Sequence, residues 1–150
     1  MATETSKVDA FVNALADALG ERAGLAGVKI FTSPDSAALD RSDCIQFIDA
    51  EMEQEWGMLG NRRREEMFTW HAAILCSKGG KTDAVARALR ARCFEILGEI
   101  EDCLRVDPTV GSVVKVSQLK NGRLEQGANS EQLTCDFVFD IEVKASLASS

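Results

Sequence analysis

The stretch FTWHAAILC, from Phe68 to Cys76, carries the clearest two-residue periodicity in the sequence. Every second residue belongs to one strongly apolar set: Phe68, Trp70, Ala72, Ile74 and Cys76. Because successive side chains of a strand point to opposite faces, this set predicts a β-strand with one apolar face. A sheet with one apolar face needs a second layer packed against it, and the rest of the chain is expected to supply that layer.

A second strand of the same kind is predicted near the end of the chain, from Thr134 to Val143. Its apolar set is Cys135, Phe137, Phe139, Ile141 and Val143. Three further strands are expected at Val28–Phe31, Cys44–Ala50 and the valine-rich Ser112–Leu119. Strands with one polar face are typical of mainly antiparallel sheets.

Two segments have the spacing of amphipathic helices. The first runs from Ser6 to Ala23, with Ser6 as its expected N-cap. Thr82 is expected to cap the second, which ends near Arg105, before Asp107-Pro108. We therefore predict one α+β domain over residues 1–150, with a mainly antiparallel or mixed sheet of about five strands and two helices packed on one face.

Two stretches have neither period and are interpreted as connections between strands. EMEQEWGMLGNRRR, from Glu51 to Arg64, places acidic residues first, then apolar residues between glycines, then three arginines. KNGRLEQGANS, from Lys120 to Ser130, is rich in residues that favour turns.

The composition excludes several classes of protein. The hydrophobic share is 45% and the charged share 27%, a balance typical of globular domains and not of disordered chains. A net charge of -7 is the opposite of the basic field of most nucleic-acid binders. The polar N-terminus lacks the apolar region of a signal peptide, and no apolar run approaches the ~20 residues that span a membrane.

The cysteines are interpreted as buried free thiols. There are five, an odd number, and no pair has C-x-x-C spacing. Four occupy apolar positions of the periodic segments: Cys44, Cys76, Cys93 and Cys135. A zinc site would need clustered cysteine and histidine, and the sequence has a single histidine, so no zinc site is predicted.

The sequence contains parts of two functional patterns, a catalytic histidine and a phosphate-binding loop, and both are incomplete. His71 falls on the less apolar face of the Phe68–Cys76 strand, and no serine or cysteine nearby is marked as its partner. SKGGKT, from Ser77 to Thr82, resembles a phosphate-binding loop, but Leu75 stands where the first glycine is required. The second stretch is therefore predicted to be a strand-to-helix turn in which glycine supplies positive φ.

Charged residues in the first connection are candidates for contacts with protein. Asp49, Glu51, Glu53 and Glu55 would share a face on an extended chain, where they could bind a divalent cation or form a solvated edge that discourages strand pairing. The basic triplet Arg62–Arg64 could contact phosphate, or it could meet an acidic protein surface, including the Glu row of a neighbouring copy.

The apolar residues of the same connection allow two readings. Trp56, Met58 and Leu59 lie outside any periodic face. Tryptophan and methionine are enriched in interface cores, but these side chains could equally fold back over the edge of the protein's own core.

Three motifs, in this order, resemble the tail terminator (tail completion) proteins of long-tailed bacteriophages. WGMLGNRRREEMFTWHAAI leads into the first clear strand, DAVARALRARCFEILGEIEDCLRVDPTVGS forms a long helix with a D-P-T-x-G end, and GRLEQGANSEQLTCDFVFDIEVKA leads through the last strand. With the N-terminal helix, the resemblance covers nearly the whole chain.

The resemblance implies a structural virion protein without catalysis or cofactor, assembled in the host cytoplasm. It implies a ring, usually of about six copies, that sits on the tail tube, stops its polymerisation and receives the head-completion (neck) proteins. Genomic DNA would pass through the lumen without specific binding. By position, subunit and tube contacts would fall in Glu51–Arg64 and Lys120–Ser130, which adds Lys120 and Arg123 to the interface candidates.

Other readings of the sequence remain open at this point. Another head–tail neck component would share the α+β layout. A small ligand-binding domain, or a hydrolase-type enzyme that uses His71 or the GGKT turn, would belong to different classes. The oligomeric state of the purified chain separates the ring from these alternatives.

Overall fold

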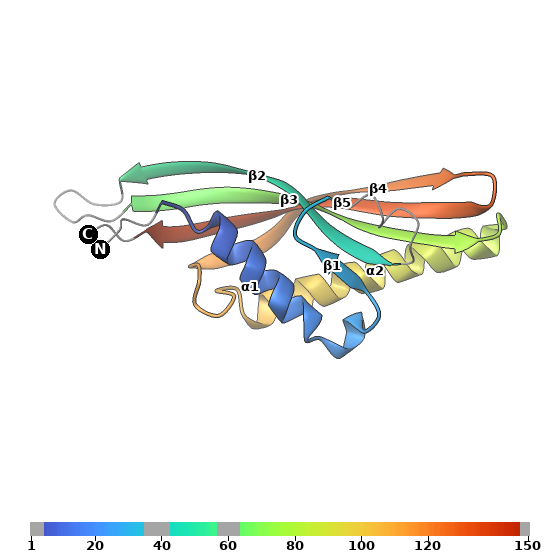
Figure 1. Ribbon diagram of the computed structural model, residues 1–150, viewed down its shortest axis with the longest axis horizontal. Helices are drawn as coiled ribbons and strands as arrows, with labels where there is room; N and C mark the ends of the chain where they lie inside the picture. The colour runs from blue at the N-terminus through green and yellow to red at the C-terminus, as the bar shows by residue number, and fades with distance from the viewer. Residues whose placement is uncertain (1–4, 35–42, 57–63, 148–150) are drawn as a thin grey trace.

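In the computed structural model of the protein, the described residues are 5–34, 43–56 and 64–147. The periodic stretch Phe68–Cys76 lies within β3 (Arg64–Gly79), the central strand of a five-stranded sheet in the order β1-β2-β3-β5-β4 (Figure 1). Thr134–Val143 lies within β5 (Gln132–Leu147), which pairs with β3 along its whole length. Both strand predictions are confirmed.

The sheet is mixed but mainly antiparallel, as predicted. The short β1 (Lys29–Phe31) runs parallel to the start of β2 (Cys44–Trp56). The pairs β2–β3, β3–β5 and β4–β5 are all antiparallel, with β4 (Val116–Ala128) at the far edge. Two hairpins, β2–β3 and β4–β5, therefore make up most of the sheet. The C-terminal end of β2 lies at one end of the molecule and the C-terminal end of β4 at the other (Figure 1).

Two helices cover one face of this sheet. Both α1 (Val8–Gly20) and α2 (Asp83–Val106) lie beneath the strands in Figure 1, with the 3-10 helix η1 (Ala23–Leu25) after α1. Each helix turns one apolar stripe to the sheet, which confirms the predicted α+β architecture with two helices on one face. No helix within the described ranges has both the length and the apolar character that spanning a membrane requires.

The helix starts follow the capping signals of the sequence, but α1 ends at Gly20, three residues before the predicted end at Ala23. Thr82 Oγ1 accepts a hydrogen bond from the backbone N–H of Val85 at 3.3 Å, so the predicted cap of α2 is confirmed. The N-cap position of α1 is Lys7, one residue later than predicted, and Ser6 Oγ accepts from the backbone N–H of Val8 at 3.0 Å.

The core lies between the sheet and the two helices. Phe11 of α1 packs its ring edge-on against Phe68 of β3, with 5.5 Å between the ring centroids. Trp70 donates a hydrogen bond from Nε1 to the carbonyl of Val8 at 3.1 Å, which satisfies its only polar atom and orients α1 on the sheet. The apolar faces predicted for the two clear strands therefore point into the core.

The connection predicted for Glu51–Arg64 is wrong at both of its ends. Residues Glu51–Trp56 continue β2, and Arg64 begins β3, opposite Trp56. The prediction failed because this half of β2 has polar residues on both faces, so the apolar alternation that marks a half-buried strand is missing. Residues 57–63 lie outside the described residues.

The connection predicted for Lys120–Ser130 is also wrong, since Lys120–Ala128 continues β4 and only a short turn follows. The predicted strand start at Ser112 is wrong as well, because β4 begins at Val116. Val110, Gly111 and Ser112 have positive φ angles of 47°, 68° and 67°, which the extended backbone of a strand does not allow.

Candidate protein–protein interface

The sheet face opposite the helices is open, and the acidic row of β2 lies on it. Phe68 points into the core, so its neighbours Met67 and Thr69 point to the open face. Glu53 is the direct cross-strand partner of Met67, and Glu51 is that of Thr69, so both glutamates share this face. Asp49, Glu51, Glu53 and Glu55 thus lie on one side of the sheet, as expected for an extended chain.

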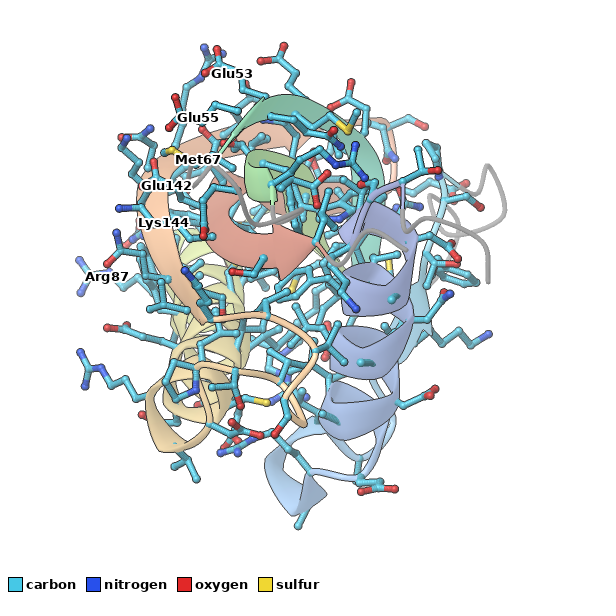
Figure 2. The ribbon with its side chains drawn as sticks, turned by 90° about the vertical axis from the view of Figure 1, so that its left-hand side faces the viewer. Glu53, Glu55, Met67, Arg87, Glu142 and Lys144 are labelled. Atoms are coloured by element: carbon cyan, nitrogen blue, oxygen red, sulfur yellow. The ribbon has the colours of Figure 1, made fainter. Side chains whose placement is uncertain are left out.

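Side chains from several strands meet on the open face. Figure 2 shows Glu53, Glu55, Met67, Glu142 and Lys144 on the side of the sheet away from the helices. Met67 is 42% exposed and lies directly opposite Lys144 of β5. Lys144 in turn lies opposite Val116 of β4, which is 41% exposed. Met67 and Val116 are thus exposed apolar side chains on a face that carries many charged groups.

Acidic groups outnumber basic ones on this face. Register and contacts place these acids there: Asp49, Glu51, Glu53, Glu55, Glu65, Glu125, Asp136, Asp140 and Glu142. The basic side chains that reach it are Lys115, Lys120, Arg123 and Lys144. A surface of this kind has a negative local field and repels phosphate groups.

The open-face charges are distributed unequally between the two edges of the sheet. Near the β4 edge, Lys120 Nζ lies 2.6 Å from Glu142 Oε2 and Arg123 pairs with Glu125. On β2, none of Glu51, Glu53 and Glu55 has an ion-pair partner among the residues that the structure describes. The β2 edge is therefore acidic, and the basic residues lie across the sheet from it.

Both long edges of the sheet are open. β1 pairs only with Cys44–Gln46, so within the described sheet the outer side of β2 has no neighbouring strand from Ile48 to Trp56. None of the described strands pairs with the outer side of β4 along Val116–Ala128. Such edges present rows of backbone N–H and C=O groups to any strand that can approach them.

Apolar side chains accompany each edge on the helix side of the sheet. On β2, Met52 lies opposite Phe68 and is 49% exposed. Beside β4, Phe94 of α2 is 49% exposed and packs edge-on against Phe137, with 5.4 Å between ring centroids. The half-buried Leu124 of β4 lies opposite Phe137.

Arg64 is the one member of the basic triplet within the described residues, and it lies beside the acidic row of its own subunit. Arg64 lies on β3, next to the acidic strand, and its Nη1 donates to Oε1 of Gln54 at 2.9 Å. Gln54 in turn donates to the buried carboxylate of Glu66 at 3.2 Å. Arg64 is thus engaged within its own subunit.

Several of the predicted interface residues fall in a segment that the structure does not describe. Met58, Leu59, Arg62 and Arg63 lie outside the described residues, and only the backbone of Trp56 is described. Both interpretations of Trp56, Met58 and Leu59, as an interface core or as side chains packed over the protein's own core, therefore stay predictions. Of the remaining candidates, Glu51, Glu53, Glu55, Lys120 and Arg123 are all exposed.

Sequence reasoning missed Lys115, Met67 and Val116 as parts of the open face. Lys115 Nζ lies 3.0 Å from Glu65 Oε2. Because Glu65 is the cross-strand partner of Glu55, this places a positive charge near one end of the acidic row. Met67 could have been found, because it belongs to the second, less apolar set of the Phe68–Cys76 alternation. No local pattern marks Lys115 or Val116, since they stand where a turn leads into an edge strand.

His71 lies on the open face between two carboxylates. Its Nδ1 is 2.6 Å from Oδ1 of Asp140, and its Nε2 is 4.0 Å from Oδ1 of Asp49. The hydrogen bond to Asp140 raises the pKa of His71, and burial partly offsets this effect. The arrangement links β2, β3 and β5 by charge on this face.

The stretch that resembles a phosphate loop is a turn between β3 and α2. Gly80 has a φ angle of 95°, which confirms the prediction that glycine supplies a positive φ here. Thr82, the residue that would bind a cation in a phosphate loop, caps α2 instead.

The cysteines are free thiols, as predicted. Cys44, Cys76, Cys93 and Cys135 are buried in the core, and Cys103 is half-buried. Burial raises the pKa of Cys44 to about 11, which keeps it protonated at neutral pH. Among the described residues, no group of three or more histidine, cysteine or acidic side chains has an arrangement that could hold a metal ion.

Neither a protein-family model nor a curated protein matches this chain.

Proposed function

We propose that this protein is a tail terminator, a structural subunit that forms a ring on the end of a phage tail tube. The ring stops polymerisation of the tube and offers a surface to the head-completion proteins of the neck. The subunit acts by binding other protein chains and carries out no catalysis. Three ordered sequence motifs and the α+β layout of five strands and two helices support this function.

The acidic open face is the observation that carries the proposal. Helices cover one face of the sheet and leave the other exposed on all four long strands (Figure 1). In a ring that turns this face inward, the lumen wall would be a sheet surface with excess carboxylates. Such a wall repels DNA phosphates, so the genome can pass without adhering to it.

The opposite surface of the subunit would then face outward. Both helices pack on the sheet side that lies away from the lumen in this arrangement (Figure 1). The C-terminal ends of β2 and β4 lie at opposite ends of the sheet, so they would lie at opposite rims of the ring (Figure 1). One rim would bind the tail tube protein and the other the neck protein.

Deletion of the gene from the phage or prophage that carries it tests the function. Electron microscopy of the resulting particles should show tails of uncontrolled length that lack heads, because nothing ends tube growth. Expression of the chain in trans should restore tails of uniform length. Tails of normal, uniform length in the deletion strain would contradict the proposal, and tails of normal length without heads would assign the chain to another neck component.

A further inference from the structure

We infer that copies of this chain join through their sheet edges, with the outer edge of β4 of one copy pairing with the outer edge of β2 of the next. The inference rests on the proposed ring and names the contact that would build it. The evidence is the presence of two open edges, the direction of their strands, and the side chains beside them.

Strand direction makes the two edges compatible. β2 is antiparallel to β3, β3 to β5, and β5 to β4. β2 and β4 of one subunit therefore run in opposite directions. When a second copy continues the sheet with its helices on the same side, its β2 runs antiparallel to β4 of the first copy, as all the long strands of the sheet do already.

Charge on the open face favours this pairing. The second copy would place its Glu51, Glu53 and Glu55 beside the edge that carries Lys120 and Arg123 of the first copy. These glutamates have no ion-pair partners among the described residues, and the basic side chains are exposed. Complementary charges across an interface favour the correct partner and its register.

Apolar contacts on the helix side favour the same pairing. Met52 of β2 lies opposite Phe68 on the helix side of the sheet and is 49% exposed. On the helix side of the β4 edge, Leu124 is half-buried and Phe94 is 49% exposed. Pairing of the two edges would bring these apolar groups together and remove them from water.

Charge also disfavours the two symmetric alternatives. A two-fold contact between two β2 edges would set one acidic row against another. A two-fold contact between two β4 edges would bring together basic groups that already have Glu125 and Glu142 beside them, and it would leave both acidic rows without a basic partner. Like charges placed opposite one another destabilise a strand pair. The acidic row therefore disfavours pairing between two β2 edges, as edge charges commonly do. It favours pairing of a β2 edge with a β4 edge.

The contact has a consequence for the assembly. It joins two different surfaces, so every copy keeps one free β2 edge and one free β4 edge until the chain of subunits closes. Closure of such a head-to-tail contact by rotation gives a ring. The sheet would then be continuous from one subunit to the next, with all open faces on the same side.

Two charge-reversal variants test the contact by complementation. E53K/E55K makes the β2 edge basic, and K120E/R123E makes the β4 edge acidic. Each variant alone sets like charges against each other across the contact. Its association should be at least roughly 100-fold weaker than that of the wild type. An equal mixture of the two variants offers two complementary contacts, E53K/E55K β2 with K120E/R123E β4 and the reverse, and should assemble again with both chains in equal number.

A matched control separates this contact from a general effect of charge. K78E/K81E changes the net charge as much as K120E/R123E does, at one exposed residue near the end of β3 and one in the turn after it, away from the β2 and β4 edges. It should assemble like the wild type. Circular dichroism of each variant checks that the fold is kept, since the ion pairs lost at Lys120 and Arg123 are on the surface.

Native mass spectrometry reads the outcome. Assembly by the wild type, the control and the mixture, with loss of assembly in each edge variant alone, is the expected result. Assembly by either edge variant alone, failure of the mixture to assemble, or a wild type that stays monomeric at its highest soluble concentration would overturn the inference. If the edge variants still form rings and still control tail length, the edge pairing is wrong and the proposed function stands.

Discussion

His71 Nδ1 lies 2.6 Å from Asp140 Oδ1, in a pair that joins β3 to β5 on the open face. The two residues are direct cross-strand partners, and Asn121 Nδ2 of β4 donates to the other oxygen of Asp140 at 3.4 Å. Asp49 approaches His71 from β2 at 4.0 Å. One polar line therefore crosses all four long strands, and its charge depends on the protonation of His71.

Stability should fall as the pH rises from roughly 6 to roughly 8. The pKa of His71 in the folded protein is raised above its unfolded value of about 6.5, chiefly by the hydrogen bond to Asp140. Its contribution is therefore complete below that unfolded value and is lost as the pH rises through the folded pKa. Urea unfolding at both pH values should show a loss of up to about 1 kcal/mol, because the pair is partly exposed.

The variant D140N isolates this effect. It removes the carboxylate that raises the pKa of His71, so the free energy of unfolding should change less with pH in the same window. D83N is a suitable control, since it breaks an exposed pair with Arg87 far from the histidine. His71 is the only histidine of the chain. If D140N keeps the full pH dependence of the wild type, the pair is not its source.

Gly122 should not accept a side chain without cost. A Cβ atom at this position of β4 would lie 2.4 Å from Cζ of Phe137, well inside van der Waals contact. G122A should therefore destabilise the protein by about 1–2 kcal/mol in urea unfolding, through overpacking. Combining it with F137L should cost less than the sum of the two single variants, because the leucine frees the space. Strict additivity would show that the two positions do not collide.

Thr82 should stabilise α2 through its side chain. T82A removes the acceptor for the Val85 N–H and should lower the free energy of unfolding by about 1 kcal/mol. T82S keeps the hydroxyl and should lie close to the wild type, so thermal or urea unfolding of the three proteins separates capping from other roles. A serine variant as unstable as the alanine variant would argue that the threonine methyl group matters instead.

Thiol labelling should distinguish one cysteine from the other four. Cys103 is half-buried, and the others are buried in the core. In the native protein at pH 7, a thiol reagent should label at most one cysteine per chain quickly, and C103S should remove that phase. Denaturant should expose all five. Rapid labelling of two or more cysteines in the native protein would contradict the packing of this core.

The sequence predicts the elements that bury one face. β3, β5, α1 and α2 each turn an apolar set to the core, and that set repeats with the period of its element. The order of these strands and helices along the chain then predicts a mainly antiparallel or mixed sheet with both helices on one face. The parallel pairing of β1 with β2 does not, because three residues carry too short a pattern to indicate a partner.

The edges were harder to predict for a physical reason. Within β4 the only buried residue is Ser117, so the strand has no apolar face for a pattern to reveal. The outer half of β2 is similar, because Glu51–Glu55 has polar residues on both faces. Such strands exist because a neighbouring strand supplies their backbone hydrogen bonds, and local sequence does not encode that neighbour.

The candidate interface was therefore only half predictable. The shared face of Glu51, Glu53 and Glu55 follows from a period of two. The place of Lys120 and Arg123 across the sheet follows from the strand order β2-β3-β5-β4, which depends on long-range pairing. Arg64, one member of the predicted basic cluster, lies on the strand next to the acidic row and hydrogen bonds Gln54, a pairing that also depends on strand order.

The mass and shape of the assembled wild-type protein test the central claim most directly. Native mass spectrometry, with negative-stain electron microscopy of the same sample, gives the number of copies and shows whether the assembly closes. We predict a closed ring of about six copies with a central channel. A monomer at the highest soluble concentration, or a two-fold dimer that does not grow further, would contradict a ring-forming subunit.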